Sequence, residues 1–109
     1  MKVLFDQGTP APLRKALISH EVSTAYERGW SKLQNGALIA AAEEAMFEVF
    51  VTTDKNLKYQ QNLAGRRIAI VVLLTTSWPR IQAHVPGVVA AIDQALPGSY
   101  SEVSVPSAA

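Results

Sequence analysis

The sequence predicts an α/β domain of three layers, in which a mostly parallel sheet of four strands lies between helices. Strand-like and helix-like segments alternate along the chain, which is typical of parallel sheets with crossover helices. Two of the strand-like segments are apolar at consecutive positions, as in strands covered on both faces. Apolar residues make up 49% of the 109 residues, which is enough for one domain with its own core.

The first part of the chain contains two predicted strands with a short helix between them. Residues 2–6 (KVLFD) form the first strand, and residues 7–12 (QGTPAP) form a turn. The helix begins near Pro12, because proline is tolerated in a first helical turn, and ends by His20. Residues 21–26 (EVSTAY) form a more polar strand, whose mixed pattern indicates a sheet edge.

The middle of the chain predicts a helix followed by a buried strand. Residues 27–34 are irregular, and Asn35 caps a helix that ends near Met46. Apolar residues at helical spacing form the buried face of this helix: Leu38, Ile39, Ala42 and Ala45. Residues 49–52 (VFVT) form the third strand, because they are mainly β-branched or aromatic.

The last part of the chain predicts the fourth strand and two helices. Residues 55–63 hold one or two helical turns, and residues 68–74 (IAIVVLL) form the clearest strand. A helical piece starts at Trp78, and the last helix covers residues 86–96. Pro97 and Gly98 end this helix, because neither residue favours its continuation.

These elements define a domain and the order of its strands. We assign residues 1–97 to the domain and residues 98–109 to a mobile C-terminal tail. A short extra strand at residues 102–105 is an alternative for part of that tail. Right-handed crossovers give the strand order 2-1-3-4, so the first and third strands are neighbours and the order reverses between them.

Two aspartates follow these neighbouring strands. Asp6 ends the first strand and Asp54 follows the third. Ligands of open α/β sheets bind where the strand order reverses, so we expect the two carboxylates to converge there. Close carboxylates repel each other unless a cation or a shared proton separates them, and Mg²⁺ or Mn²⁺ accepts such oxygen ligands. The alternative is structural, because aspartate often caps turns and helices.

Other polar residues near Asp54 are candidates for binding a metal or a phosphodiester substrate. Asn56 is a candidate metal ligand through its amide oxygen, and Lys55 and Lys58 would offset phosphate charge. Tyr59 would stack on a base of single-stranded RNA or, alternatively, pack against the sheet. Hydroxyl contacts are expected from residues that follow the third and fourth strands: Thr52, Thr53, Thr75 and Ser77.

Composition excludes several classes of site. The chain has no cysteine, which excludes disulfides and thiolate zinc sites, and its net charge of +1 is not the basic footprint of a duplex-binding protein. Asp6 interrupts the first apolar run, so no signal peptide is expected. The longest aliphatic run, residues 68–74, is far shorter than the ~20 residues of a membrane span. We expect a cytoplasmic protein with no membrane contact, and the polar edge strand makes a homodimer an alternative to a monomer.

The residues quoted above resemble the PIN-like proteins, short relatives of the PIN-domain ribonucleases. The resemblance covers about residues 1–78. It rests on three stretches: the opening MKVLFDQGTP, His20-Glu21-Val22, and Thr52-Thr53-Asp54-Lys55-Asn56-Leu57. It implies a PIN-like fold and a metal-dependent, RNA-cleaving site of the kind found in the toxins of toxin–antitoxin pairs. It also implies that Asp6 and Asp54 coordinate the metal and that an antitoxin protein is a partner.

The chain departs from the family pattern at three places. After the last predicted strand it has Thr75-Thr76-Ser77, where fuller PIN domains often carry an acid. Asn35 stands at the start of the second helix, where the family usually has an acid, and Asn56 stands where many relatives have a further aspartate. An amide binds a hard cation less well than a carboxylate does. The alternative function is therefore a weakly active or inactive PIN-like module that binds RNA or a protein partner.

Overall fold

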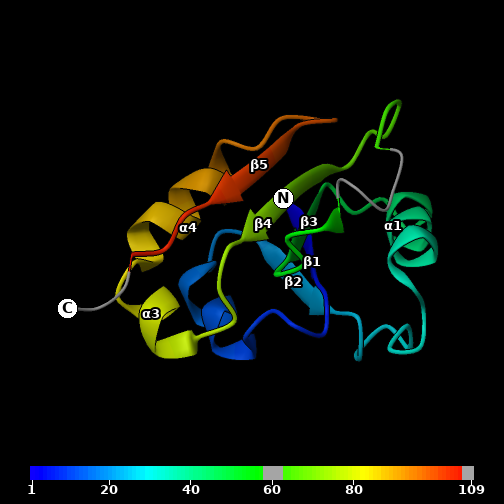
Figure 1. Ribbon diagram of the computed structural model, residues 1–109. Coiled ribbons are helices and arrows are strands. Elements are labelled where there is room, and N and C mark those ends of the chain that lie inside the picture. The colour runs from blue at the N-terminus through cyan, green and yellow to red at the C-terminus, as the bar shows by residue number, and fades with distance from the viewer. Residues whose placement is uncertain (58–62, 107–109) are drawn as a thin grey trace.

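The computed structural model describes residues 1–57 and 63–106 of the chain (Figure 1). One sheet is formed by β1 (Lys2–Phe5), β2 (Glu21–Thr24), β3 (Val49–Thr52), β4 (Ala69–Leu73) and β5 (Tyr100–Val103). The helices of this part of the chain are the 3₁₀ helix η1 (Ala11–Ala16) and the α-helices α1 (Asn35–Glu44), α3 (Trp78–Gln82) and α4 (Val85–Asp93). The predicted α/β class is confirmed.

All neighbouring strands of the sheet run parallel, in the order β2-β1-β3-β4-β5. The predicted order of the first four strands is confirmed, and so is the position of β2 at an edge. The predicted number of four strands is wrong, because β5 pairs with β4 and forms the other edge. The alternative of an extra strand near residues 102–105 describes this segment better than a mobile tail does. The sheet therefore extends into residues 98–109, which were assigned to the tail.

The composition of β5 explains why it is a weak sequence signal. Its residues are YSEV, and only Val103 is buried, with 9% of its surface exposed. Val105, just beyond the strand, is also buried at 4% exposure and joins the same core cluster. A half-polar strand of four residues has neither the alternation nor the continuous apolar run that identifies a strand in a sequence.

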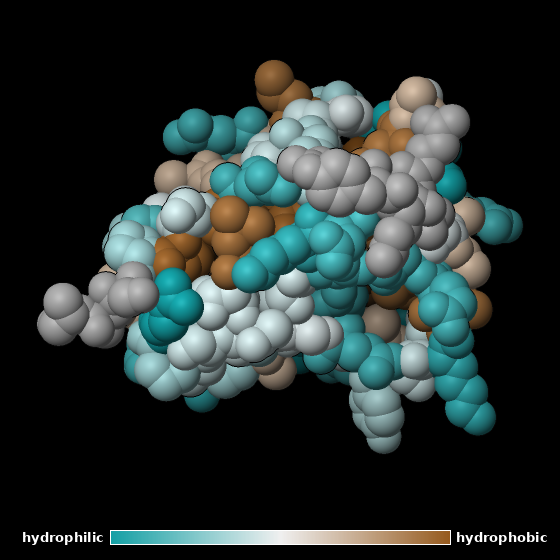
Figure 2. Space-filling view, viewed as in Figure 1, coloured by the Kyte–Doolittle hydropathy of each residue, from teal (hydrophilic) through white to brown (hydrophobic). Residues whose placement is uncertain are grey.

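Side chains of successive strand residues enter two separate cores, one on each face of the sheet. Val3 and Phe5 of β1 contact the core under η1, α3 and α4, whereas Leu4 between them contacts the core under α1. In Figure 1, α3 and α4 accordingly lie on one side of the sheet and α1 on the other. Figure 2 shows only small brown areas among teal and white residues on this face, as expected when most apolar side chains are inside.

The helices differ from their predicted bounds in ways that the backbone explains. Asn35 is the first residue of α1, and Gln34 occupies the N-cap position without a side-chain cap bond, so the prediction that Asn35 caps the helix is wrong. The helix ends at Glu44, and Met46 has a positive φ of 68°, which a continuing helix does not allow. The last helix, α4, begins one residue earlier and ends three residues earlier than predicted.

None of the helices within residues 1–57 and 63–106 has the length and apolar character needed to pass through a bilayer.

Candidate functional site

The pairing of β1 with β3 fixes the position of Asp6. Phe5 is in register with Val51, and the Asp6 N–H donates a hydrogen bond to the Val51 carbonyl (3.1 Å), which continues the ladder by one residue. Asp6 therefore leaves the sheet beside the end of β3. This is the carboxyl edge of the parallel strands, at the point where strand order reverses.

The Asp6 carboxylate is half-buried and is surrounded by donors. Its Oδ1 accepts hydrogen bonds from the Thr9 N–H (3.1 Å) and from the Thr9 hydroxyl (2.8 Å), and its Oδ2 accepts one from the buried Thr52 hydroxyl. Burial raises the pKa of the Asp6 carboxyl above its ordinary value, against the opposing effect of these donors. The charged form is thus held at a cost in a site from which water is partly excluded.

The Asp54 carboxylate has a different set of partners. Its Oδ2 accepts a hydrogen bond from the Asn35 side-chain nitrogen (2.7 Å), and its Oδ1 accepts one from the Asn56 N–H (2.9 Å). The second bond is the local side-chain turn that aspartate commonly makes two residues ahead. The first bond connects the start of α1 to the loop after β3. Asp54 is thereby held at the same edge of the sheet as Asp6.

The hydroxyl of Thr52 connects the two aspartates. It accepts a hydrogen bond from the Asp54 N–H (3.1 Å) and donates one to Asp6 Oδ2. Thr52 is the last residue of β3 and is completely buried, so this connection is made by a side chain that the core holds in place. A single hydroxyl therefore couples the Asp6 carboxylate to the backbone of the Asp54 loop.

The loops after β1 and β3 also approach each other at Gly8. A Cβ atom placed on Gly8 would lie 2.5 Å from the Thr53 hydroxyl oxygen and 3.8 Å from Asp6 Oδ1. Real Cβ atoms do not come this close to an oxygen, so a larger residue at position 8 would displace Thr53 or the Gly8 loop. The close approach requires glycine for a steric reason and places the Thr53 hydroxyl beside the Asp6 loop.

The remaining predicted site residues are not among the partners of the Asp6 or Asp54 carboxylates through their described side chains. The Lys55 and Asn56 side chains are exposed, and the contact that Asn56 makes with Asp54 comes from its backbone N–H. Lys58 and Tyr59 lie outside the described residues. Thr75 and Ser77, the expected hydroxyl donors after β4, instead stabilise the start of α3: Thr75 accepts from the Ser77 N–H (3.1 Å) and Ser77 accepts from the Arg80 N–H (3.4 Å).

The donor atoms at this edge determine which metal ion they could hold. Within residues 1–57 and 63–106, no three acidic or histidine side chains gather closely enough to bind a metal ion together. The available oxygens are those of the Asp6 and Asp54 carboxylates and of the threonine hydroxyls near them. Such hard oxygen donors match Mg²⁺ or Mn²⁺, which bind through one or two carboxylates and keep several waters.

A hollow lies next to Asp6, on the side toward β2. Its volume is about 390 Å³, and its lining includes Asp6, Gln7, Thr9, Thr24, Tyr26 and Ser31. Asp54 is not among the described residues that line it. A smaller hollow of about 220 Å³ lies at the opposite edge of the sheet and is lined by Met1, Met46, Phe47 and Pro97 among others. Parallel sheets bind ligands at the carboxyl edge, so the hollow beside Asp6 is the candidate binding site.

Two contacts of the site are not found by sequence reasoning. Thr9 donates twice to Asp6, and its N–H also bonds the Asp6 carbonyl (3.3 Å), so residues 6–9 form a turn that starts with aspartate. Asp at the first position of a turn, with Thr three residues later, is the signal that identifies this contact. The contact of Asn35 with Asp54 depends on how α1 packs on the sheet, which no local pattern reveals.

Comparison with known proteins gives no relative for this chain. Neither the protein-family models nor the curated proteins contain a match, and no solved structure matches the fold. The assignment of function therefore rests on the geometry of the carboxyl edge described above.

Proposed function

We propose that this protein is a Mg²⁺- or Mn²⁺-dependent ribonuclease of PIN-like type that acts in the cytoplasm. The observation that carries the proposal is the Thr52 hydroxyl, which couples the Asp6 carboxylate to the Asp54 loop where the strand order reverses. Two carboxylates that follow neighbouring strands at this place of an open α/β sheet can supply oxygen ligands to a divalent cation.

Each residue of the site has a distinct role in this proposal. Asp6 and Asp54 would hold the metal ion, with Asn56 as an auxiliary ligand. A bound divalent ion supplies the activation of water and the stabilisation of charge that phosphodiester cleavage needs. The exposed Lys55 would offset substrate phosphate charge, and the Thr53 hydroxyl, which lies beside Gly8, would donate to a phosphate oxygen. Lys58 and Tyr59, which lie outside the described residues, remain candidate substrate-binding residues of this proposal.

The burial of the Asp6 carboxylate supports the proposal that a cation binds next to it. Burial raises the pKa of the Asp6 carboxyl, which means that the surroundings penalise its charged form. A cation next to the carboxylate would remove much of that penalty. The same proposal places the protein as the toxin of a toxin–antitoxin pair, with an antitoxin protein as partner and the edge strand β2 as a surface for homodimer formation.

The decisive experiment measures cleavage of a fluorescently labelled single-stranded RNA by wild type, Asp6→Asn and Asp54→Asn, each with Mn²⁺ and with EDTA. Both substitutions keep the side-chain shape, and we expect each to lower cleavage by at least 100-fold, about 2.7 kcal/mol of lost transition-state stabilisation. Glu44→Gln, which removes an exposed acid from α1, is the matched control and should cleave as wild type does. Equal cleavage by all four proteins would identify a contaminating nuclease and refute the proposal.

The second candidate function is a non-catalytic module of the same fold that binds RNA or a protein partner. It is favoured by the bonds of Asp54, because both of its carboxylate oxygens already accept hydrogen bonds from Asn35 and Asn56. Binding of the labelled RNA by wild type without metal-dependent cleavage would select this function over the ribonuclease.

A further inference from the structure

We propose that the hollow beside Asp6 binds one base of single-stranded RNA, with the ring of Tyr26 as the stacking surface. The inference rests on the proposed function and names the substrate subsite that the metal-binding pair lacks. It assigns substrate binding to the β2 side of the site, whereas Lys55 and Asn56 lie on the β3 side.

The hollow has the size and position of a ligand subsite. Its volume of about 390 Å³ falls within the range of about 300–1,000 Å³ that is typical of small-molecule pockets. Asp6 lies in its lining, and Tyr26 follows β2 in the lining on the other side. A base held in the hollow would therefore place its own phosphodiester near the Asp6 carboxylate.

Tyr26 presents an aromatic ring that the fold itself does not use. Its side chain is 80% exposed even though the residue lines the hollow. The neighbouring Ala25 is buried at 1% exposure, and its N–H bonds the Phe5 carbonyl (2.9 Å), so the backbone that carries Tyr26 is fixed to β1. A solvent-exposed aromatic ring on a fixed backbone is an element on which proteins stack the bases of single-stranded RNA.

Polar groups that line the hollow bond to other parts of the protein and hold its walls in place. The Thr24 hydroxyl accepts a hydrogen bond from the Glu27 N–H (3.1 Å), and its interaction with the Glu27 carboxylate helps to lower the pKa of that group. The Gln7 side-chain nitrogen donates to the Ser31 carbonyl and thereby connects the loop after β1 to the segment before α1. Gln7 and Ser31 both line the hollow, so this bond holds one of its walls together.

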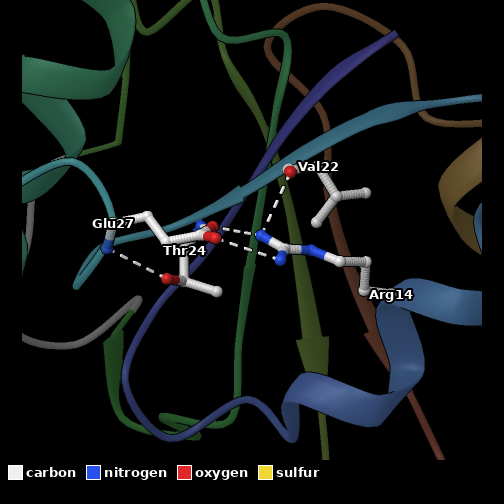
Figure 3. Close-up of polar contacts among 4 residues, drawn as sticks. All are labelled: Arg14, Val22, Thr24 and Glu27. Carbon is white, nitrogen blue, oxygen red and sulfur yellow. Dashed lines mark hydrogen bonds and ion pairs between the residues drawn. The ribbon is translucent and has the colours of Figure 1, made fainter.

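The Glu27 carboxylate, next to Thr24 of the lining, is paired with an arginine, which reduces its repulsion of a phosphate. Figure 3 shows the Arg14 guanidinium extending from η1 to the Glu27 carboxylate and to the Val22 carbonyl of β2. Both Glu27 oxygens accept from Arg14, at 3.1 Å for Oε2 and at a shorter distance for Oε1, which also accepts from the Thr24 N–H (2.9 Å). The ion pair leaves no net charge beside Thr24.

The test compares Tyr26→Ala, Tyr26→Phe and Leu96→Ala in binding and cleavage of labelled oligoadenylate. Stacking on one aromatic ring contributes about 5- to 150-fold in affinity, so we expect Tyr26→Ala to weaken binding and raise KM within this range with kcat little changed. Tyr26→Phe keeps the ring and should stay within about threefold of wild type, since stacking uses the ring face. Leu96→Ala removes a side chain of similar exposure (68%) far from the hollow and should change neither quantity.

An abasic oligonucleotide of the same length separates base stacking from phosphate contacts. Wild type and Tyr26→Ala should bind it equally. If wild type cleaves oligoadenylate and Tyr26→Ala does so with an unchanged KM, the base subsite is wrong while the ribonuclease stands. If wild type binds oligoadenylate without cleaving it and Tyr26→Ala loses binding, the subsite is supported and the ribonuclease fails. Absence of binding to oligoadenylate by wild type overturns the subsite.

Discussion

The Thr52 hydroxyl provides the most direct structural test of how the two aspartates are coupled. Thr52→Val replaces the hydroxyl with a methyl group of nearly the same size, so the buried packing at the end of β3 is kept. The substitution removes the donor to Asp6 Oδ2 and the acceptor of the Asp54 N–H, which lies 3.1 Å from the Thr52 oxygen.

The expected loss of stability follows from these two bonds. A hydrogen bond to a charged group contributes about 1.5–3 kcal/mol and a neutral one about 0.5–1.5 kcal/mol. Asp6 keeps its two bonds from Thr9, and the saved desolvation of the hydroxyl offsets part of the loss. We therefore expect Thr52→Val to lower the free energy of unfolding by about 2 kcal/mol, which corresponds to a fall in Tm of about 8 °C for a domain of this size.

The assay is urea denaturation with Thr52→Ser as the control. Thr52→Ser keeps the hydroxyl and removes one buried methyl group, at a cost of about 1 kcal/mol. Hydrogen exchange of the Asp54 amide gives an independent readout, since it should become faster in Thr52→Val and stay slow in Thr52→Ser. A Thr52→Val protein as stable as wild type, with a protected Asp54 amide, would refute the coupling.

Three further predictions concern the surroundings of the site. Gly8→Ala should lower the free energy of unfolding by about 1–3 kcal/mol, because the added Cβ meets the Thr53 hydroxyl. In a Thr53→Ala background, the loss of stability measured by urea denaturation should fall by at least half. An unchanged loss would contradict the contact between these positions. The hydrogen bond from Arg14 is the main cause that lowers the pKa of Glu27 from its ordinary value of 4.5 to about 2. The ionised Glu27 therefore contributes fully to stability above pH 4.5, and this contribution is lost as the pH falls through about 2. Glu27→Gln should therefore be less stable than wild type at pH 7, and the difference in urea midpoints should shrink as the pH falls from 4.5 through about 2. A constant difference across this window would contradict the assignment. Asn35→Asp would replace a 2.7 Å hydrogen bond to Asp54 by two facing carboxylates. Without metal, the Tm of this variant should lie below that of wild type, and on addition of Mn²⁺ it should rise more than that of wild type does. A Tm that does not respond to Mn²⁺ would argue against a metal at this position.

The fold could be predicted from the sequence wherever strands are buried on both faces. The consecutive apolar residues of β3 and β4 identify these strands directly, and the right-handed crossover rule then gives the order of the first four. The strand β5 could not be predicted with the same method, because Ser101 and Glu102 interrupt its apolar pattern and its burial comes from pairing with β4. Its stability is therefore a tertiary effect.

The candidate site was predictable in position but not in its contacts. Asp6 and Asp54 could be placed at one edge because strand ends and strand order are visible in the sequence. The hydrogen bonds that these carboxylates accept could not be predicted from the sequence. Asn35 reaches Asp54 only through the packing of α1 on the sheet. The Thr52 hydroxyl was expected near a ligand, and in the structure it donates to Asp6. The hollow beside Tyr26 was also outside sequence reasoning, since it forms between loops of different strands.

Calorimetric titration of Mn²⁺ into wild type, Asp6→Asn and Asp54→Asn, with Glu44→Gln as the control, tests the central claim most directly. Mn²⁺ binding to Glu44→Gln should equal that to wild type, and each aspartate variant should lose affinity by at least tenfold, about 1.4 kcal/mol. Undiminished Mn²⁺ binding in both aspartate variants, or no binding to wild type, would contradict a divalent cation held between Asp6 and Asp54.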